Sequence, residues 1–358
     1  MADRSAVAGR RPSWLSRGPR VGPARPAPRW LKSVRSSRAA RILTEFPEAG
    51  ILLAAAAIFA GWSIFAPEFL TTDNLLSIGQ QISFIGIVAT GMTFLLIAGE
   101  LDLSVGSMYG FLAIVFAVLV VDQGWNLVLA IAITILFGLV IGFVNGFFTT
   151  QFRIPSFIVT LGMLGILRGA ALVLSGGLPV GTVTDQTFNT VSAGLFFGST
   201  VPAQVFWLAG VMIVAGAVLA FTKFGYQVYA TGGNRLASAH AGIKTRRTKL
   251  FCFMLTGGLV GLIGVLAVGW LGNANPLTGQ GFELQVIAAV VIGGTSLFGG
   301  AGSVFGTFLG AAIIGMISNG LILVGVDQYY QQLVTGTIIV AAALLNVTVR
   351  RATASEEE

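Results

Sequence analysis

The sequence is poor in charged residues, cysteine and histidine, and each shortage excludes a class of protein. Asp, Glu, Lys and Arg make up only 10% of the 358 residues, too few to cover the surface of a water-soluble globule. The lone Cys252 excludes an intramolecular disulfide and a thiolate metal cluster, and the lone His240 removes the usual histidine-based sites. We therefore expect no metal site in this chain.

A second absence concerns nucleotide chemistry. The phosphate-binding pattern GxxxxGK[ST] does not occur in the sequence, so the chain lacks the loop that cradles ATP phosphates in many ATPases. We therefore do not expect the chain to be an enzyme, and we expect no cofactor bound to it.

Long apolar stretches recur in the sequence from Ile51 almost to Val349. Hydrophobic residues make up 55% of the chain and its 48 glycines suit close helix packing in lipid. A spanning helix needs about 20 mostly apolar residues. We predict an all-α polytopic membrane bundle of about ten transmembrane helices, with interrupted or re-entrant segments, at 49–66, 76–98, 105–121, 127–149, 155–174, 204–221, 250–271, 286–300, 303–325 and 331–349.

The positions of Lys and Arg give this division a direction, because short cytosolic loops retain basic residues. With the N-terminus inside, the cytosolic turns hold Arg153, a cluster between Lys223 and Lys249, and Arg350 and Arg351. The turns predicted outside hold acidic residues instead. We therefore expect both termini in the cytosol.

The formal charge of +7 is concentrated in the N-terminal residues. Residues 1–47 are rich in Arg and Pro and cannot bury enough apolar surface to fold alone, so we predict a disordered cytosolic tail that anionic lipid attracts. Because the basic excess is confined to this tail, we expect no nucleic-acid partner. Residues 48–350 are then the transmembrane domain, with a cytosolic loop at 222–249, and residues 351–358 are a cytosolic C-terminal tail.

Two acidic residues, Glu100 and Asp102, interrupt the apolar sequence between the second and third predicted spans. Carboxylates in such a position are costly unless they are solvated or paired. Water solvates both if the segment is a cytosolic turn. If a broken helix buries them, Arg168 is the expected partner, because it is the one cation inside a predicted span. Both interpretations are open from the sequence.

Three further polar residues, Asn145, Thr160 and Asn319, lie on predicted apolar helices. Such residues either line a solute path or hydrogen-bond a neighbouring helix, and helix packing is the more common role. We therefore hold them as candidate pore-lining residues, with helix packing as the favoured alternative.

Three separated segments carry distinctive motifs: GMTFLLIAGELDLSVGS at 91–107, RIPSFIVTLG at 153–162 with Arg168–Gly169, and VIGGTSL at 291–297 with Gly299, Gly300 and Gly306. They resemble motifs that occur in the same order in the permease subunits of ribose-type ATP-binding-cassette (ABC) importers. The resemblance extends over most of residues 70–349. The family has GGIDLSVGS in the first segment, so Glu100 and Leu101 depart from it while Asp102 matches.

The segment GGNRLASAHAGI at 232–243 resembles the cytoplasmic coupling helix of the same family, written approximately GGNxxAAxxSGI. Small residues let a helix lie against a partner surface, and a glycine ends it. The resemblance assigns coupling to the ATPase to Gly233, Asn234, Ala237, Gly242 and Ile243.

The resemblance also implies partners and a location. It implies a second permease copy, in a homodimer or a heterodimer, and two cytosolic ATPase modules that hold ATP and Mg. An extracytoplasmic solute-binding protein would dock on the outer connection at 175–203, and the chain would cross the inner membrane of a bacterium in contact with lipid. The LDLSVGS motif favours a sugar or polyol as the solute.

Three alternatives remain at this stage, of which a structural or receptor-like membrane scaffold would be favoured if the purified protein stimulated no ATPase. Another is a branched-chain amino acid ABC permease, which belongs to the same superfamily. The third is an ion-coupled secondary transporter, in which Glu100 or Asp102 would be the coupling site.

Overall fold

The computed structural model describes residues 47–181, 183–195, 200–327, 330, 332–341 and 344. The predicted tails at 1–47 and 351–358 lie outside this range, apart from Pro47. Within the described residues every regular element is helical, as predicted. The α-helices are α3 (Pro47–Phe65), α4 (Thr72–Ile97), α5 (Val105–Ala117), α6 (Leu127–Gln151), α7 (Ser156–Ser175), α8 (Gln186–Ser192), α9 (Ala203–Phe221), α10 (Lys223–Gly233), α11 (Arg235–His240), α12 (Thr245–Leu271), α13 (Phe282–Ile292) and α14 (Val304–Leu323).

Eight of these helices are long and apolar enough to cross a membrane, where α5 is counted with the π-helical turn η3 (Val118–Asp122) that continues it. Two shorter apolar helices, α13 and Gln332–Ala341, occupy the remaining two predicted spans. The prediction of about ten spans with interruptions is therefore confirmed as a fold class.

The predicted span at 286–300 needs correction, because α13 ends at Ile292. Its 11 residues extend about 16 Å, about half of a 30 Å hydrocarbon layer. The next residues form a loop in which Gly294, Gly299 and Gly300 have φ values of 83°, 86° and 79°. Glycine adopts this left-handed conformation freely, so the loop leaves the helix although its composition is apolar.

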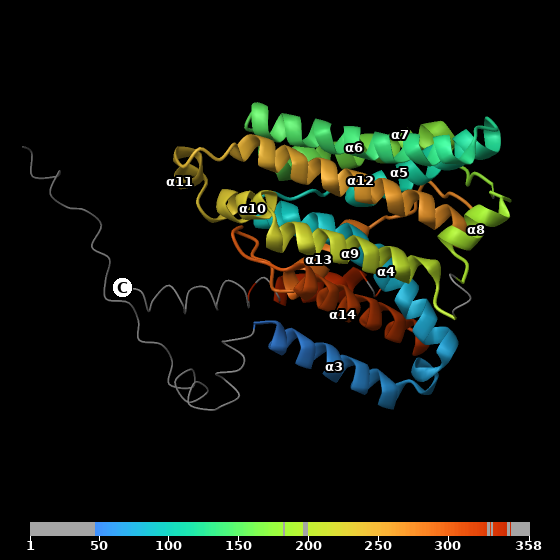
Figure 1. Cartoon of the computed structure of the whole chain (residues 1–358). Helices are drawn as coiled ribbons and strands as arrows, with labels where there is room; N and C mark the ends of the chain where they lie inside the picture. Colours follow the sequence, from blue (N-terminus) through green and yellow to red (C-terminus); the bar gives the residue numbers. More distant parts are fainter. Residues whose placement is uncertain are drawn as a thin grey trace, which may run out of the picture.

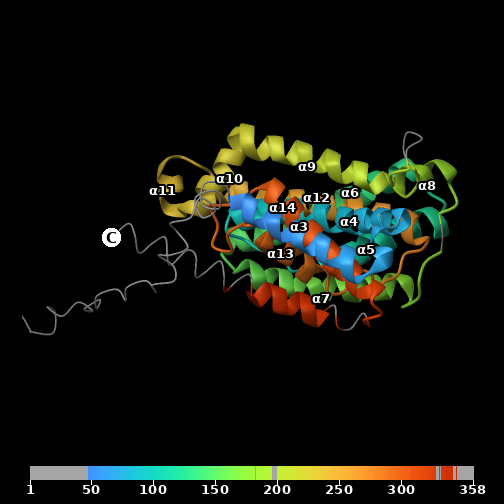
Figure 2. The same ribbon diagram turned by 90° about the horizontal axis from the view of Figure 1, so that it is seen from below.

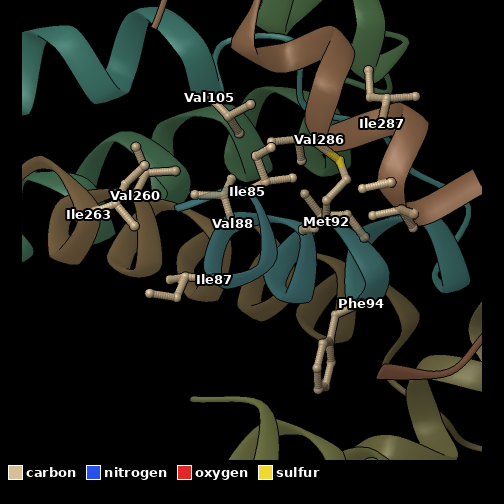
Figure 3. Close-up of a cluster of buried hydrophobic side chains, with 14 of the residues drawn as sticks. Ile85, Ile87, Val88, Met92, Phe94, Val105, Val260, Ile263, Val286 and Ile287 are labelled. Carbon is tan, nitrogen blue, oxygen red and sulfur yellow. The ribbon is translucent and has the colours of Figure 1, made fainter. Parts of the chain in front are cut away.

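Helix α4 is the centre of the bundle and α3 is at its edge (Figure 1). Of an 18-residue apolar stretch in each helix, 83% of the residues are buried in α4 but only 6% are buried in α3. Side chains of α4, α5, α12 and α13 meet in the main apolar core, where Met92 and Val286 are fully buried (Figure 3). Displacing α4 therefore disturbs most of the core.

Glycines allow α6 and α12 to approach backbone to backbone. A Cβ atom on Gly138 would collide with the carbonyl of Gly257, and one on Gly257 would collide with the carbonyl of Gly138. This contact replaces side-chain interdigitation with close dispersion packing, the arrangement that small residues permit between membrane helices.

The short helices divide between the two ends of the bundle. Helices α10 and α11 lie at one end and α8 lies at the opposite end (Figures 1 and 2). The first end carries the basic residues Lys223, Arg235, Lys244, Arg246 and Arg247, which the sequence places between α9 and the first turn of α12. We refer to it below as the basic end.

Candidate functional site

The LDLSVGS motif begins in a break between α4 and α5. The break is a helix ending of the Schellman type: the Gly99 N–H donates to the Leu96 carbonyl and the Glu100 N–H donates to the Leu95 carbonyl. Gly99 has a φ of 76°, which favours glycine at this position. The chain then runs through residues 100–104 before α5 begins at Val105.

Asp102 is the buried anchor of this break, with no exposed surface. Its Oδ1 accepts hydrogen bonds from the Ser104 N–H at 2.8 Å and the Ser104 hydroxyl at 2.6 Å. Asn145 of α6 donates to Asp102 Oδ2 at 3.2 Å and to Ser104 Oγ at 3.0 Å. Burial raises the pKa of the Asp102 carboxyl group, and the hydrogen bonds from Ser104 and Asn145 oppose that shift.

Helix α7 holds the other side of the break. The Leu103 N–H donates to the Thr160 hydroxyl at 3.0 Å, and the Leu101 N–H donates to the Ser156 hydroxyl at 3.3 Å. The second resembling segment, which starts at Arg153, thus supplies acceptors for backbone N–H groups of the first. Asn145 and Thr160 both join neighbouring elements here, as helix-packing residues do.

Glu100 forms an ion pair that the sequence did not predict. Its Oε1 lies 2.5 Å from Nζ of Lys249, and the two side chains are 13% and 9% exposed. Lys249 belongs to the second turn of α12 and is separated from Glu100 by 149 positions. The cluster of basic residues in the sequence therefore contains one member that is buried and paired.

The hypothesis of a pair between Arg168 and Glu100 or Asp102 needs correction. Arg168 lies two helical turns beyond Thr160 on α7, about 12 Å along the helix axis, and so is remote from the break. Its Nη1 donates to the carbonyls of Pro276 and Thr278 at 2.5 and 3.0 Å. Glu283 is the acidic residue that attracts it electrostatically. Arg168 therefore fixes the segment between α12 and α13.

The third candidate pore-lining residue, Asn319 of α14, donates to Oδ1 of Asn74 on α4 at 2.8 Å. Its own Oδ1 accepts no hydrogen bond within the described residues, as is also true of Oδ1 of Asn145. Each amide thus joins two elements of the bundle and keeps one acceptor unused.

The coupling-like segment forms a separate short helix, α11, between α10 and α12. Asn234 caps it, since its Oδ1 accepts from the Ala237 N–H at 3.0 Å. At its other end Gly242, with a φ of 85°, donates to the Ala239 carbonyl, and the Ile243 N–H donates to the Ser238 carbonyl. This is the same Schellman pattern as at Gly99.

Most of α11 faces outward from the bundle. Ser238 is buried and its hydroxyl donates to the Ala230 carbonyl of α10 at 2.6 Å, which attaches the two helices. Asn234 and Ala237 are exposed, and so is Leu236, an apolar side chain of which 75% is accessible. An exposed apolar side chain on a short protruding helix is a typical docking feature.

Backbone contacts link this segment to the α4–α5 break. A Cβ atom on Gly232 would collide with the Ile97 carbonyl and would approach the Gly300 N–H to 2.8 Å. The Gly300 N–H donates to the same Ile97 carbonyl at 2.9 Å. The end of α10, the end of α4 and the loop after α13 therefore meet at one point, which we call the glycine junction (Gly232, Ile97 and Gly300).

Comparison with known proteins places these features in a family. Residues 74–343 match the family model described as "Branched-chain amino acid transport system / permease component". The chain is 39% identical over 299 residues to the "Ribose import permease protein RbsC" of Escherichia coli K12. This alignment covers 82% of this chain and 92% of that protein.

Two further relatives agree with this. The ribose import permease protein RbsC of Bacillus subtilis is 40% identical over 285 residues, covering 79% of this chain and 88% of that protein. The L-arabinose ABC transporter permease protein AraH of Azospirillum brasilense is 36% identical over 299 residues, covering 83% and 86%. No solved structure matches the chain.

Proposed function

The chain belongs to the family of branched-chain amino acid transport system permease components and is a permease of the carbohydrate ABC importer type, and on that premise we propose that its solute is a pentose. The relatives named above are ribose and L-arabinose permeases. The motif LDLSVGS at 101–107 also favours a sugar over a branched-chain amino acid.

One observation carries the mechanism that we propose. The coupling segment, residues 232–243, is flanked by two contacts to the end of α4. At its first residue, Gly232 packs against the Ile97 carbonyl in the glycine junction. After it, Lys249 pairs with Glu100, three residues beyond that carbonyl. A displacement of the segment therefore reaches α4 through backbone packing on one side and through an ion pair on the other.

Helix α4 then distributes the displacement. It packs against α9, α12, α13 and α14 and is buried on nearly all sides. Close-packed cores respond to a shift of one element by switching between discrete packings. We propose that closure of the ATPase pair moves α11 with α10, that α4 follows, and that access to the solute path passes from the outer to the inner face.

The break itself is proposed as the rigid part of this device. Asp102 is held by Ser104 and Asn145, and α7 holds the two N–H groups of Leu101 and Leu103. Since these bonds join α5, α6 and α7 around the break, the three helices move as one body when α4 shifts.

The partners follow the same proposal. Gly233, Asn234, Ala237, Gly242 and Ile243 would face one of two cytosolic ATPase modules, which hold ATP and Mg. A second permease copy would complete the solute path, and an extracytoplasmic binding protein would deliver the pentose at the end that carries α8. The basic end would then be cytosolic, with both chain termini on that side and the bundle in a bacterial inner membrane.

The test is transport by purified components. The permease, its ATPase and its binding protein are reconstituted in vesicles, and uptake of ribose, L-arabinose, galactose and leucine is measured with ATP hydrolysis. Pentose uptake that stimulates hydrolysis supports the proposal, whereas preferential leucine uptake refutes the proposed substrate class. Uptake that survives ATP depletion and stops when a proton gradient is collapsed refutes the mechanism in favour of ion coupling.

A matched pair of variants tests the coupling segment. Gly242→Trp places a large side chain beside α11, where a Cβ meets no atom within 4 Å, at a φ of 85°. Gly124→Trp makes the same change in a turn between η3 and α6, at a φ of 65° and with equal space. We expect Gly242→Trp to lose stimulated hydrolysis and uptake together, while Gly124→Trp keeps both.

A further inference from the structure

A pocket of about 460 Å³ lies at the basic end, between the last turns of α6 and the first turns of α12. None of its lining residues belongs to the α4–α5 break or to α11, although Ile243, the last residue of the coupling segment, lies at its edge. Its lining combines cationic side chains with apolar ones, chiefly Lys244, Arg246, Arg247, Phe147 and Leu250.

The charge of the pocket is of one sign. Lys244, Arg246 and Arg247 are exposed, and the lining contains no Asp or Glu. In the part of the chain that the structure describes, the one ion pair is Lys249–Glu100, so the three pocket cations have no carboxylate partner. Three clustered cations around a cavity favour an anionic ligand.

The backbone adds to this preference. No side chain caps the N-terminus of α12, and its first bonds are from Thr245 to the Ile243 carbonyl and from Thr248 to the Lys244 carbonyl. Within the described residues, the N–H groups of Arg246 and Arg247 accordingly have no acceptor. Unsatisfied N–H groups at a helix N-terminus, together with the helix dipole, attract an anion.

The apolar half of the pocket indicates which anion. Phe147 and Leu250 line it, and Phe147 belongs to a group of exposed phenylalanines at the end of α6, with Phe143, Phe148 and the C-cap residue Phe152. In a membrane protein such a face contacts acyl chains. A ligand that fits the pocket therefore has a phosphate at one end and hydrocarbon at the other.

We propose that this pocket binds the headgroup of an anionic phospholipid of the leaflet at the basic end. The cations and the free N–H groups hold the phosphate, and the phenylalanines of α6 contact the acyl chains. Basic pockets between transmembrane helices bind anionic headgroups in this manner. The proposal does not depend on the transported solute, since lipid binding is measurable on the permease alone.

The experiment measures retention of phosphatidylglycerol and phosphatidylcholine by the purified permease, using native mass spectrometry of mixed lipid–detergent micelles. The pocket variant is R246Q/R247Q. The control is K223Q/R235Q, which removes the same charge from exposed residues of the basic end outside the pocket lining. Each cation that contacts the headgroup strengthens anionic lipid binding about fivefold, so we expect phosphatidylglycerol to bind about 25-fold more weakly to the pocket variant.

The control variant should stay within about twofold of wild type if local contact, and not net charge, decides binding. R246K/R247K, which keeps both charges, should retain the lipid, and Phe147→Ser should weaken retention without a change of charge. Equal loss in the control variant would refute a specific pocket. Displacement by inorganic phosphate alone would assign the pocket to a free anion and also overturn the proposal.

A partner protein is the remaining competitor for these cations. If R246Q/R247Q retained phosphatidylglycerol normally but lost association with the ATPase subunits, the cations would serve the ATPase and the lipid proposal would be wrong. Loss of the lipid from the isolated permease, with no ATPase present, supports the proposal independently of transport.

Discussion

Neutralising Lys249 tests the ion pair that joins α12 to the α4–α5 break. The Lys249 and Glu100 side chains are 9% and 13% exposed, so water screens them little. Removing one partner of such a pair leaves the other charge buried without compensation, at a cost of about 3–5 kcal/mol. We expect Lys249→Met and Glu100→Gln each to destabilise the permease by about 3 kcal/mol.

The double variant separates the pair from its surroundings. With both charges removed, neither group is left as an uncompensated ion, and replacing a whole buried pair by neutral groups is often close to neutral. We therefore expect the double variant to be within about 1 kcal/mol of wild type, with a coupling energy far above that of an exposed pair.

Unfolding in mixed micelles, followed by circular dichroism, gives the three free-energy differences. Stimulated ATP hydrolysis in vesicles then distinguishes a pair that only stabilises the fold from one that also transmits motion. If the pair transmits motion, as we expect, the double variant regains stability without regaining full stimulation. If the two single substitutions cost under about 0.5 kcal/mol each, the pair behaves as a solvated surface contact, and its place in the proposed transmission is refuted.

Three further substitutions follow from the described contacts. Asp102→Asn should cost about 1–3 kcal/mol, because its amide would turn a donor toward the Asn145 amide, and D102N/N145D should restore stability in the same unfolding assay; no restoration would contradict the assigned bond. Gly257→Val should cost about 1–3 kcal/mol or more through its collision with α6, whereas Gly162→Val, in open space on α7, should cost nothing measurable, because valine has a better helix propensity than glycine. Arg168→Gln should cost about 2 kcal/mol by weakening two charge-assisted bonds to carbonyls and should increase protease cleavage between α12 and α13; unchanged cleavage would refute that anchoring role.

The long helices could be predicted because hydropathy and length are local properties of the sequence. The same measure failed over VIGGTSLFGG at 291–300, which continues the apolar sequence of α13, because left-handed glycines follow the end of the helix at Ile292. Composition records how apolar a segment is, whereas backbone conformation at glycine depends on what packs against it.

The contacts of the break were harder to predict than its location. The acidic residues and their unusual setting indicated that residues 100–102 matter. The partner of Glu100 is Lys249, 149 positions away. Hydropathy and charge predict that Lys249 belongs to a solvent-exposed loop, whereas it lies in α12. Asn145 and Thr160 were expected to serve helix packing more than a pore, but the sequence does not say which element they hold. Pairing over such separations depends on the three-dimensional packing.

The contrast between the buried α4 and the peripheral α3 sets two different tolerances for mutation. A side chain in α4 has neighbours on every side, so the gain or loss of one methyl group strains the packing or leaves a cavity. A side chain in α3 needs mainly to be apolar, since only 6% of the residues in the apolar stretch of this helix are buried within the chain. Over evolutionary time α3 should exchange Leu, Ile, Val and Phe freely and keep little record of ancestry, whereas α4 should change slowly and preserve the lineage's history.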